Sequence, residues 1–393
     1  MEQNTQDPEI TVSYQKLARK VKEISLYIHI PFCTRKCNYC NFYSITYDAK
    51  LAENYIRSLT KEISQYKNKN YALTSIYIGG GTPSLLSFPL LFSLFSGIND
   101  TFSISPNIEV TIEANPASIT KDASRYWNIL GINRVSMGVQ SFNDNELKIL
   151  GRIHSEKDIQ PAFEIVRDHC TENISLDLMY GIPVQTHGTL MKSLQRAIEL
   201  EPKHISSYCL SLEKGTPLFD ARAHYTFPSE DIQKEMYYSM LSFLEDNCFH
   251  QYEISNFSNK GYESQHNISY WKGKEYIGCG AAAHSFYDMT RKENISDVQR
   301  YINNMQNEQS VCKSSKLISK REYISDMIFL GLRMTKGVPL SYLKKELGFD
   351  VIIEYSDIID KYSKLGYLTV ENDHLKLTKK ALFVSDEILS EFV

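Results

Sequence analysis

The segment Cys33-Thr34-Arg35-Lys36-Cys37-Asn38-Tyr39-Cys40 gathers three cysteines into eight residues, directly after the apolar run Ser25–Ile30. The other five cysteines are scattered along the 393-residue chain, which is not the pattern of a disulfide framework. This spacing lets one short loop wrap three thiolates around an iron–sulfur cluster, and three ligands leave one iron of a four-iron cube open. A structural zinc site would need a fourth ligand at similar spacing, and none follows nearby. We therefore expect Cys33, Cys37 and Cys40 to hold a [4Fe-4S] cluster, with zinc as the alternative.

The composition narrows the class of protein. Lys and Arg number 43 against 47 Asp and Glu, which gives a net charge of −4. The chain therefore lacks the excess of positive charge that is typical of nucleic-acid-binding proteins, and we expect no nucleic-acid partner. The first residues, Met1–Pro8, are polar and acidic, unlike a signal peptide, and no apolar run approaches the ~18 residues of a membrane span. We expect a folded cytoplasmic protein whose membrane association, if any, is peripheral.

Short strand-like runs alternate with helical patterns between Ser25 and Leu212, which predicts a parallel α/β architecture. Six such units are fewer than the eight that close a full barrel, so the favoured fold is a partial (β/α)6 barrel, with an open doubly wound sheet as the alternative. The expected strands are Ser25–Ile30, Ser75–Ile78, Ile108–Glu113, Arg134–Gly138, Ser175–Met179 and Ile205–Leu210.

Four segments are expected. An N-terminal arm (1–24) precedes the partial barrel (25–228), and an aromatic-rich extension (229–300) follows it. Three helical patterns and a hairpin then predict a small helical, winged-helix-like domain at 301–393, after a polar stretch that is a candidate linker, Ser310–Ser319 included. Such domains often bind DNA, but no basic recognition helix stands out, so an iron–sulfur DNA regulator is only a distant alternative.

Further polar residues lie at the ends of the expected strands. The run Gly79-Gly80-Gly81-Thr82 follows the second strand, where glycines let the backbone approach a ligand closely. Polar groups on apolar strands are costly to bury without a partner, and an elongated polar cofactor across the barrel mouth would supply one. Alternatively, these side chains satisfy one another. The polar residues in question are Glu113, Gln140, Arg152 and Asp177.

The cysteine motif, with an aromatic residue before its last cysteine, resembles that of radical S-adenosylmethionine (SAM) proteins. The flanking run Leu26–Cys33 is similar to oxygen-independent coproporphyrinogen dehydrogenases, also named oxidases, and to their relatives, the HemW-like heme chaperones. The resemblance implies that SAM binds the open iron and can be cleaved reductively to a 5′-deoxyadenosyl radical and methionine. It also implies the SAM contacts, which are Tyr27, Tyr39, Gly79, Gly80, Gly81, Thr82, Glu113, Gln140, Arg152, Asp177 and, through its backbone, Cys209.

Two features separate these relatives. The dehydrogenase has a fourth cysteine two residues after the motif, where this chain has Phe42. The run His266-Asn267-Ile268-Ser269-Tyr270-Trp271 is similar to a motif associated with heme binding in the HemW-like proteins. A histidine within an aromatic wall can ligate heme iron, so His266 is the expected heme ligand, with a packed core histidine as the alternative.

The resemblance therefore implies a protein that binds SAM and heme and delivers heme to membrane-bound respiratory proteins. It also implies an electron donor such as flavodoxin, and it leaves a homodimer open. The first alternative is the enzyme that decarboxylates coproporphyrinogen III propionates to vinyls, against which Phe42 weighs. A tetrapyrrole-cleaving methyltransferase that uses two SAM molecules is a further alternative.

Overall fold

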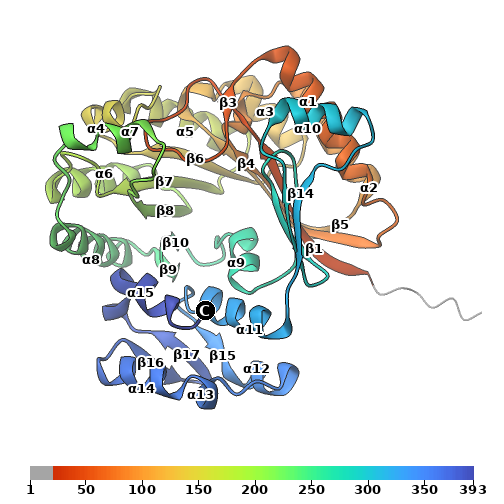
Figure 1. The fold of residues 1–393 in the computed structure, drawn as a ribbon. Helices are drawn as coiled ribbons and strands as arrows, with labels where there is room; N and C mark the ends of the chain where they lie inside the picture. The colour runs from red at the N-terminus through yellow and green to blue at the C-terminus, as the bar shows by residue number, and fades with distance from the viewer. Residues whose placement is uncertain (1–20) are drawn as a thin grey trace, which may run out of the picture.

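A computed structural model describes residues 21–393 of the chain. Its main feature is an open twelve-stranded sheet in the order β14-β13-β12-β11-β1-β4-β5-β6-β7-β8-β10-β9. Figure 1 shows the central strands curving as an arc, with helices on the outer side and the C-terminal segment beyond the concave side. Because β1 and β8 pair with other strands and not with each other, the barrel does not close.

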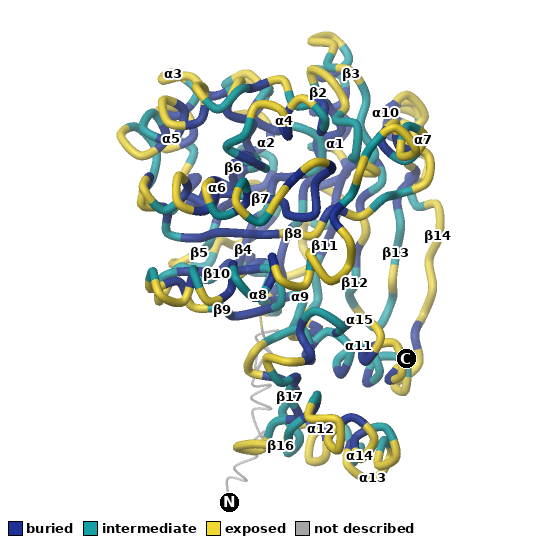
Figure 2. The backbone as a smooth tube through the Cα atoms, turned by 90° about the vertical axis from the view of Figure 1, so that its left-hand side faces the viewer, coloured by how far each residue is buried: buried dark blue, intermediate teal, exposed yellow. Residues whose placement is uncertain are grey.

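The six expected strands are confirmed as the parallel centre of this sheet. Their side chains are largely buried, and Figure 2 shows this centre in dark blue beneath helices with exposed outer faces. Neighbours run parallel, as in the register Ile28↔Ile78 between the first two of them. The strands are β1 (Lys22–Ile30), β4 (Tyr71–Gly80), β5 (Ser103–Ala114), β6 (Arg134–Gln140), β7 (Ile174–Tyr180) and β8 (His204–Cys209). Residues 1–20 of the expected arm lie outside the described residues, and β1 already includes its last three.

Helices connect these strands and cover the outer face. In the first, α1 (Ala49–Ser64), apolar residues at helical spacing are buried, and Asp48 caps the helix by accepting a hydrogen bond from the Leu51 amide at 2.7 Å. The others are α2 (Phe88–Thr101), α3 (Lys121–Ile129), α4 (Asp144–Ile149), α5 (Glu156–His169), α6 (His187–Glu199), α7 (Pro217–Asp220) and α8 (Glu230–Asp246). Two short strands flank the cysteine loop, β2 (Phe32–Cys33) and β3 (Ile45–Thr46).

The aromatic-rich extension widens the sheet at both edges. Strand β10 (Asn256–Ser258) pairs antiparallel with β8 and β9 (His250–Glu253), while β11 (Tyr276–Cys279) pairs parallel with β1. Between them, helix α9 (Gln265–Trp271) lies on the concave side (Figure 1). An antiparallel run then continues the β11 edge through β12 (His284–Tyr287), β13 (Thr290–Asn294) and β14 (Cys312–Leu317), with α10 (Val298–Gln306) inserted before its last strand.

The predicted linker at Ser310–Ser319 is wrong. Most of it is β14, which pairs with β13 along five residue pairs from Thr290↔Leu317 to Asn294↔Cys312. An edge strand exposes one side to solvent and therefore has the polar composition that suggested a linker. The expected domain boundary at 300/301 accordingly falls inside α10.

The C-terminal segment has the three helical regions and the hairpin that its sequence predicts, plus a third strand. Its elements are α11 (Lys320–Gly331), β15 (Val338–Pro339), α12 (Leu340–Leu347), α13 (Val351–Glu354), α14 (Ser356–Lys364), β16 (Leu368–Glu371), β17 (His374–Leu377) and α15 (Ser385–Ser390). The small sheet is antiparallel in the order β15-β17-β16.

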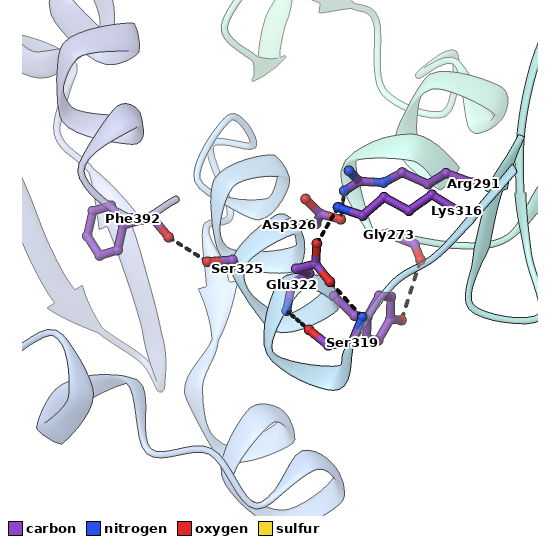
Figure 3. A network of polar contacts seen from close by, with 9 residues as sticks. Gly273, Arg291, Lys316, Ser319, Glu322, Ser325, Asp326 and Phe392 are labelled. Carbon is purple, nitrogen blue, oxygen red and sulfur yellow. Dashed lines mark hydrogen bonds and ion pairs between the residues drawn. The ribbon is translucent and has the colours of Figure 1, made fainter. Parts of the chain in front are cut away.

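Helix α11 joins this segment to the main sheet (Figure 3). Arg291 of β13 pairs with Asp326, Lys316 of β14 reaches Glu322 at 2.6 Å, and the Ser325 hydroxyl donates to the Phe392 carbonyl at 2.7 Å. None of the helices in residues 21–393 has the length and apolar character needed to cross a membrane.

Candidate functional site

A cavity of about 480 Å³ opens where the central parallel strands end. The ends of four strands contribute to its wall: Gly80 with the following Gly81 at β4, Ala114 at β5, Gln140 at β6 and Cys209 at β8. Ligands of parallel α/β folds bind at this edge of the sheet because the loops there carry side chains without the constraint of strand pairing.

The three clustered cysteines share one side of this cavity. All three are free thiols, and two sulfurs already accept hydrogen bonds from site residues: Arg152 Nη1 lies 3.4 Å from Cys37 Sγ, and Thr82 Oγ1 lies 3.6 Å from Cys33 Sγ. Donors of this kind are a recognised means of setting the properties of iron–sulfur clusters. The cysteine loop is itself anchored, because the Asn38 side chain donates to the Ile149 carbonyl at 2.9 Å.

The donor arrangement differs from that of a single-ion site. Four ligands at ~2.3 Å around one zinc would bring their sulfurs to within roughly 4 Å of one another. Within residues 21–393, no group of three or more His, Cys, Asp or Glu side chains is gathered in this way. Three free thiols on one cavity wall, two of them with hydrogen-bond donors beside them, have the chemistry to ligate an iron–sulfur cluster.

Close packing requires the glycine run at the end of β4. A Cβ at Gly81 would lie 2.6 Å from the Phe32 carbonyl oxygen, and one at Gly79 would lie 2.9 Å from a Glu113 carboxylate oxygen. Gly80 has a φ of +116°, which side chains with a Cβ rarely adopt. The run therefore brings bare backbone to the cavity wall, where a polar cofactor can contact it.

Glu113 is held by two donors at the cavity wall. The Tyr77 hydroxyl donates to Oε1 at 2.8 Å and the Gly80 amide donates to Oε2 at 3.0 Å. Burial nevertheless raises the pKa of Glu113 to about 7, because the charged form loses hydration. A cationic or hydrogen-bond-donating ligand would recover that loss.

Asp177 occupies a similar position on β7. Both of its carboxylate oxygens accept from the Ser136 hydroxyl at 3.0 Å, and burial raises its pKa. Two half-buried carboxyls that line one cavity suit a ligand with amino and hydroxyl donors, and SAM has both.

Gln140 and Arg152 complete this wall. Gln140 has a φ of +68°, a strained conformation for a residue with a side chain, and such strain concentrates at functional sites. Arg152 donates to the Gly138 carbonyl, while its buried Nε has no partner among the described residues. This free donor and the strained glutamine fit an anionic or polar ligand group, so the residues present fit both the cluster and SAM.

The structure brings most of the expected site residues together. Those that line the cavity are Cys33, Cys37, Tyr39, Cys40, Gly80, Gly81, Thr82, Glu113, Gln140, Arg152, Asp177 and Cys209. Tyr27, Gly79 and His266 do not line it. Tyr27 lies behind the wall, where its ring stacks on Tyr77 with centroids 6.2 Å apart.

His266 is 1% exposed, and both of its ring nitrogens are engaged inside the protein. Nδ1 lies 2.8 Å from the Ser75 hydroxyl and Nε2 lies 2.9 Å from the Tyr270 hydroxyl. Burial lowers its pKa to about 3, so the ring is neutral. Because an iron ligand needs a free nitrogen, this geometry is that of a packed core histidine, and heme ligation by His266 stays a prediction that requires α9 to unpack.

The cavity residues that sequence reasoning missed include Tyr77, Arg134, Tyr208 and Asn267. Arg134 was detectable, because it is a charge at the start of an otherwise apolar strand, and it proves 2% exposed with an unpartnered Nε. Tyr77 and Tyr208 were not, because aromatic residues in strands are usually core.

Comparisons with known proteins agree with this geometry. The family model of the Radical SAM superfamily matches residues 27–197, and that of the HemN C-terminal domain matches residues 318–384. A heme chaperone HemW of Bacillus subtilis is 33% identical over 94% of this chain and 99% of its own. A second, from Escherichia coli, is 37% identical over 67% of this chain and 70% of its own.

A solved structure of the coproporphyrinogen III oxidase HemN from Escherichia coli has a TM-score of 0.83 at 21% identity, covering 95% of this chain and 91% of that one. This likeness shows the shared fold. The cavity gathers three thiols and polar groups that fit SAM, and the alignment to the curated relative from Bacillus subtilis spans nearly the full length of both chains. The chain therefore belongs to the HemW family of radical SAM proteins.

Proposed function

We propose that this protein is a heme chaperone that binds a [4Fe-4S] cluster, SAM and heme, and passes heme to respiratory proteins. The observation that carries the proposal is the residue at the cavity mouth beside the cysteines. Phe42, in place of the fourth cysteine of the dehydrogenase, lines the cavity and exposes 65% of its surface. An exposed phenyl ring offers an apolar surface to a flat macrocycle and cannot take the role of a thiol.

The cluster and SAM, when bound, supply one-electron reductive chemistry. The chain contributes binding and orientation. Cys33, Cys37 and Cys40 would hold the cluster, Glu113 and Asp177 would accept hydrogen bonds from the donors of SAM, and the remaining cavity residues would keep water from the sulfonium.

Heme would dock at the mouth of the cavity. Ile153, which is 40% exposed, lines the cavity together with Phe42, and Arg35 and Lys36 add two exposed cations. An apolar surface beside two cations complements a porphyrin face with two propionates. Arg35 also donates to the Gly151 carbonyl at 3.0 Å, which ties the cysteine loop to the loop that carries Ile153.

The partners follow from this role. We propose a cytoplasmic location, a flavodoxin-like electron donor, and membrane-bound respiratory heme proteins as recipients. All eight cysteines are free thiols, which supports a reducing compartment.

The test is a heme titration of the anaerobically reconstituted protein, followed by absorbance. We expect saturation near one heme per chain and weaker binding by Phe42→Asp. Phe92→Asp, at a phenylalanine that is 55% exposed on α2 outside the cavity, is the matched control and should bind like the wild type. Saturable binding should be followed by transfer of heme to membrane vesicles that contain a heme-free respiratory cytochrome. Failure of the wild type to bind heme would contradict the proposal.

A further inference from the structure

Helix α9 supports the SAM-site wall from behind. The His266 ring stacks on Tyr77 with centroids 5.1 Å apart and planes 29° apart, and Tyr77 in turn stacks on Tyr27. Three rings from α9, β4 and β1 therefore form one column. The next residue of the helix, Asn267, lines the cavity itself.

The His266 ring is fixed in this column. Besides the contacts of both nitrogens, the backbone amides of Gln265 and His266 each donate to a Glu109 carboxylate oxygen at 2.9 Å. The edge of the Tyr270 ring packs on the imidazole, with centroids 4.8 Å apart and planes 80° apart. Turning the ring would leave the Tyr270 hydroxyl without its partner and would take one of two partners from the Ser75 hydroxyl, which also donates to Ser25 at 3.0 Å. Losing hydrogen bonds in the interior is costly.

The column ends on a ligand-binding carboxylate. Tyr77 uses its hydroxyl to hold Glu113 Oε1, and the Gly80 amide holds the other oxygen. Because the imidazole packs on the face of the Tyr77 ring, it limits how far the hydroxyl that holds Glu113 can move. Replacing His266 by a small residue would open space behind the Tyr77 ring and release the hydroxyl.

We infer that His266 is a positioning residue of the SAM site, which holds Glu113 in place through the stacked ring and hydroxyl of Tyr77. The inference rests on the proposed function in that SAM is the ligand. It gives the histidine of the His-Asn-x-x-Tyr-Trp run a role that needs no contact with heme.

The experiment measures SAM affinity of anaerobically reconstituted full-length variants by equilibrium dialysis. His266→Ala and Tyr77→Phe should each weaken SAM binding by about tenfold, the scale of one hydrogen bond to a charged group. The double variant should be weakened by about tenfold as well, and not a hundredfold, because both changes remove the same support. His250→Ala, at an exposed histidine on β9 outside the cavity, should bind SAM like the wild type.

His266→Phe keeps a ring behind Tyr77 and should retain more SAM affinity than His266→Ala; it also serves if the alanine variant does not fold. Unchanged SAM affinity in folded His266→Ala, or fully multiplicative losses in the double variant, would overturn the inference. Absence of SAM binding by the wild type would instead contradict the proposed function, so the two failures are distinguishable.

Discussion

We predict that Glu113 makes SAM affinity dependent on pH, and one substitution can isolate its contribution. Its pKa is raised to about 7 in the free protein, chiefly by burial, so the carboxyl is about nine-tenths ionised at pH 8 and about one-tenth ionised at pH 6. If only the ionised form accepts the donors of SAM, the apparent Kd rises by the inverse of that fraction. Glu113 alone should therefore weaken SAM binding about tenfold between pH 8 and pH 6.

The assay is anaerobic equilibrium dialysis of the reconstituted protein at pH 6, 7 and 8, with Glu113→Gln as the reference. The reference is needed because the amino group of SAM also titrates near pH 8 and its effect persists in both proteins. Asp177, whose pKa is raised too, adds a contribution that Glu113→Gln leaves in place. The wild type should show an additional loss of about tenfold at pH 6. Identical pH profiles for the two proteins would show that ionisation of Glu113 does not control SAM binding.

Three further predictions concern stability and the cluster. Burial raises the pKa of Glu62 from 4.5 to about 7, so the free energy of unfolding of the wild type should fall by about 3 kcal/mol as the pH rises from 4.5 to 7. Chemical denaturation of Glu62→Gln should show a flatter dependence of that free energy on pH. Equal pH dependence in the two proteins would contradict this. Cys37→Ser should lose the iron content and the visible absorbance of the cluster, whereas Cys312→Ser, which lies outside the cavity, should keep both. Retention of the full cluster by Cys37→Ser would exclude Cys37 as a ligand. Gly81→Ala should destabilise the fold by about 1–3 kcal/mol in thermal unfolding, because its Cβ would meet the Phe32 carbonyl. The control Gly188→Ala, whose Cβ would have no neighbour nearer than 3.8 Å apart from the adjacent residues and the backbone of its own helix, should not destabilise the fold. Equal effects of the two variants would argue against tight packing at the glycine run.

Much of the site was predictable because its residues lie at strand ends, where sequence order and spatial order coincide. The parallel strands bring Glu113, Gln140 and Asp177 to one edge whatever their separation in the chain. The order of strands along the chain could not predict where β11 lies. This strand pairs with β1 although some 250 residues separate them, and tertiary packing, not a local sequence pattern, determines that pairing.

The role of α9 was hidden for a related reason. A histidine beside Tyr270 and Trp271 has the composition of a heme pocket and of an aromatic core alike, and only the packing of His266 on Tyr77 separates the two. The polar composition of β14 likewise reflects an edge strand, which a one-dimensional pattern cannot distinguish from a linker.

With Phe42 in place of a fourth cysteine, we propose that this radical SAM site serves heme binding and not decarboxylation. The most direct test incubates the reconstituted protein with coproporphyrinogen III, SAM and a reductant, beside a parallel titration with heme. We expect stoichiometric heme binding and no vinyl-bearing product. Formation of protoporphyrinogen at a catalytic rate would contradict it.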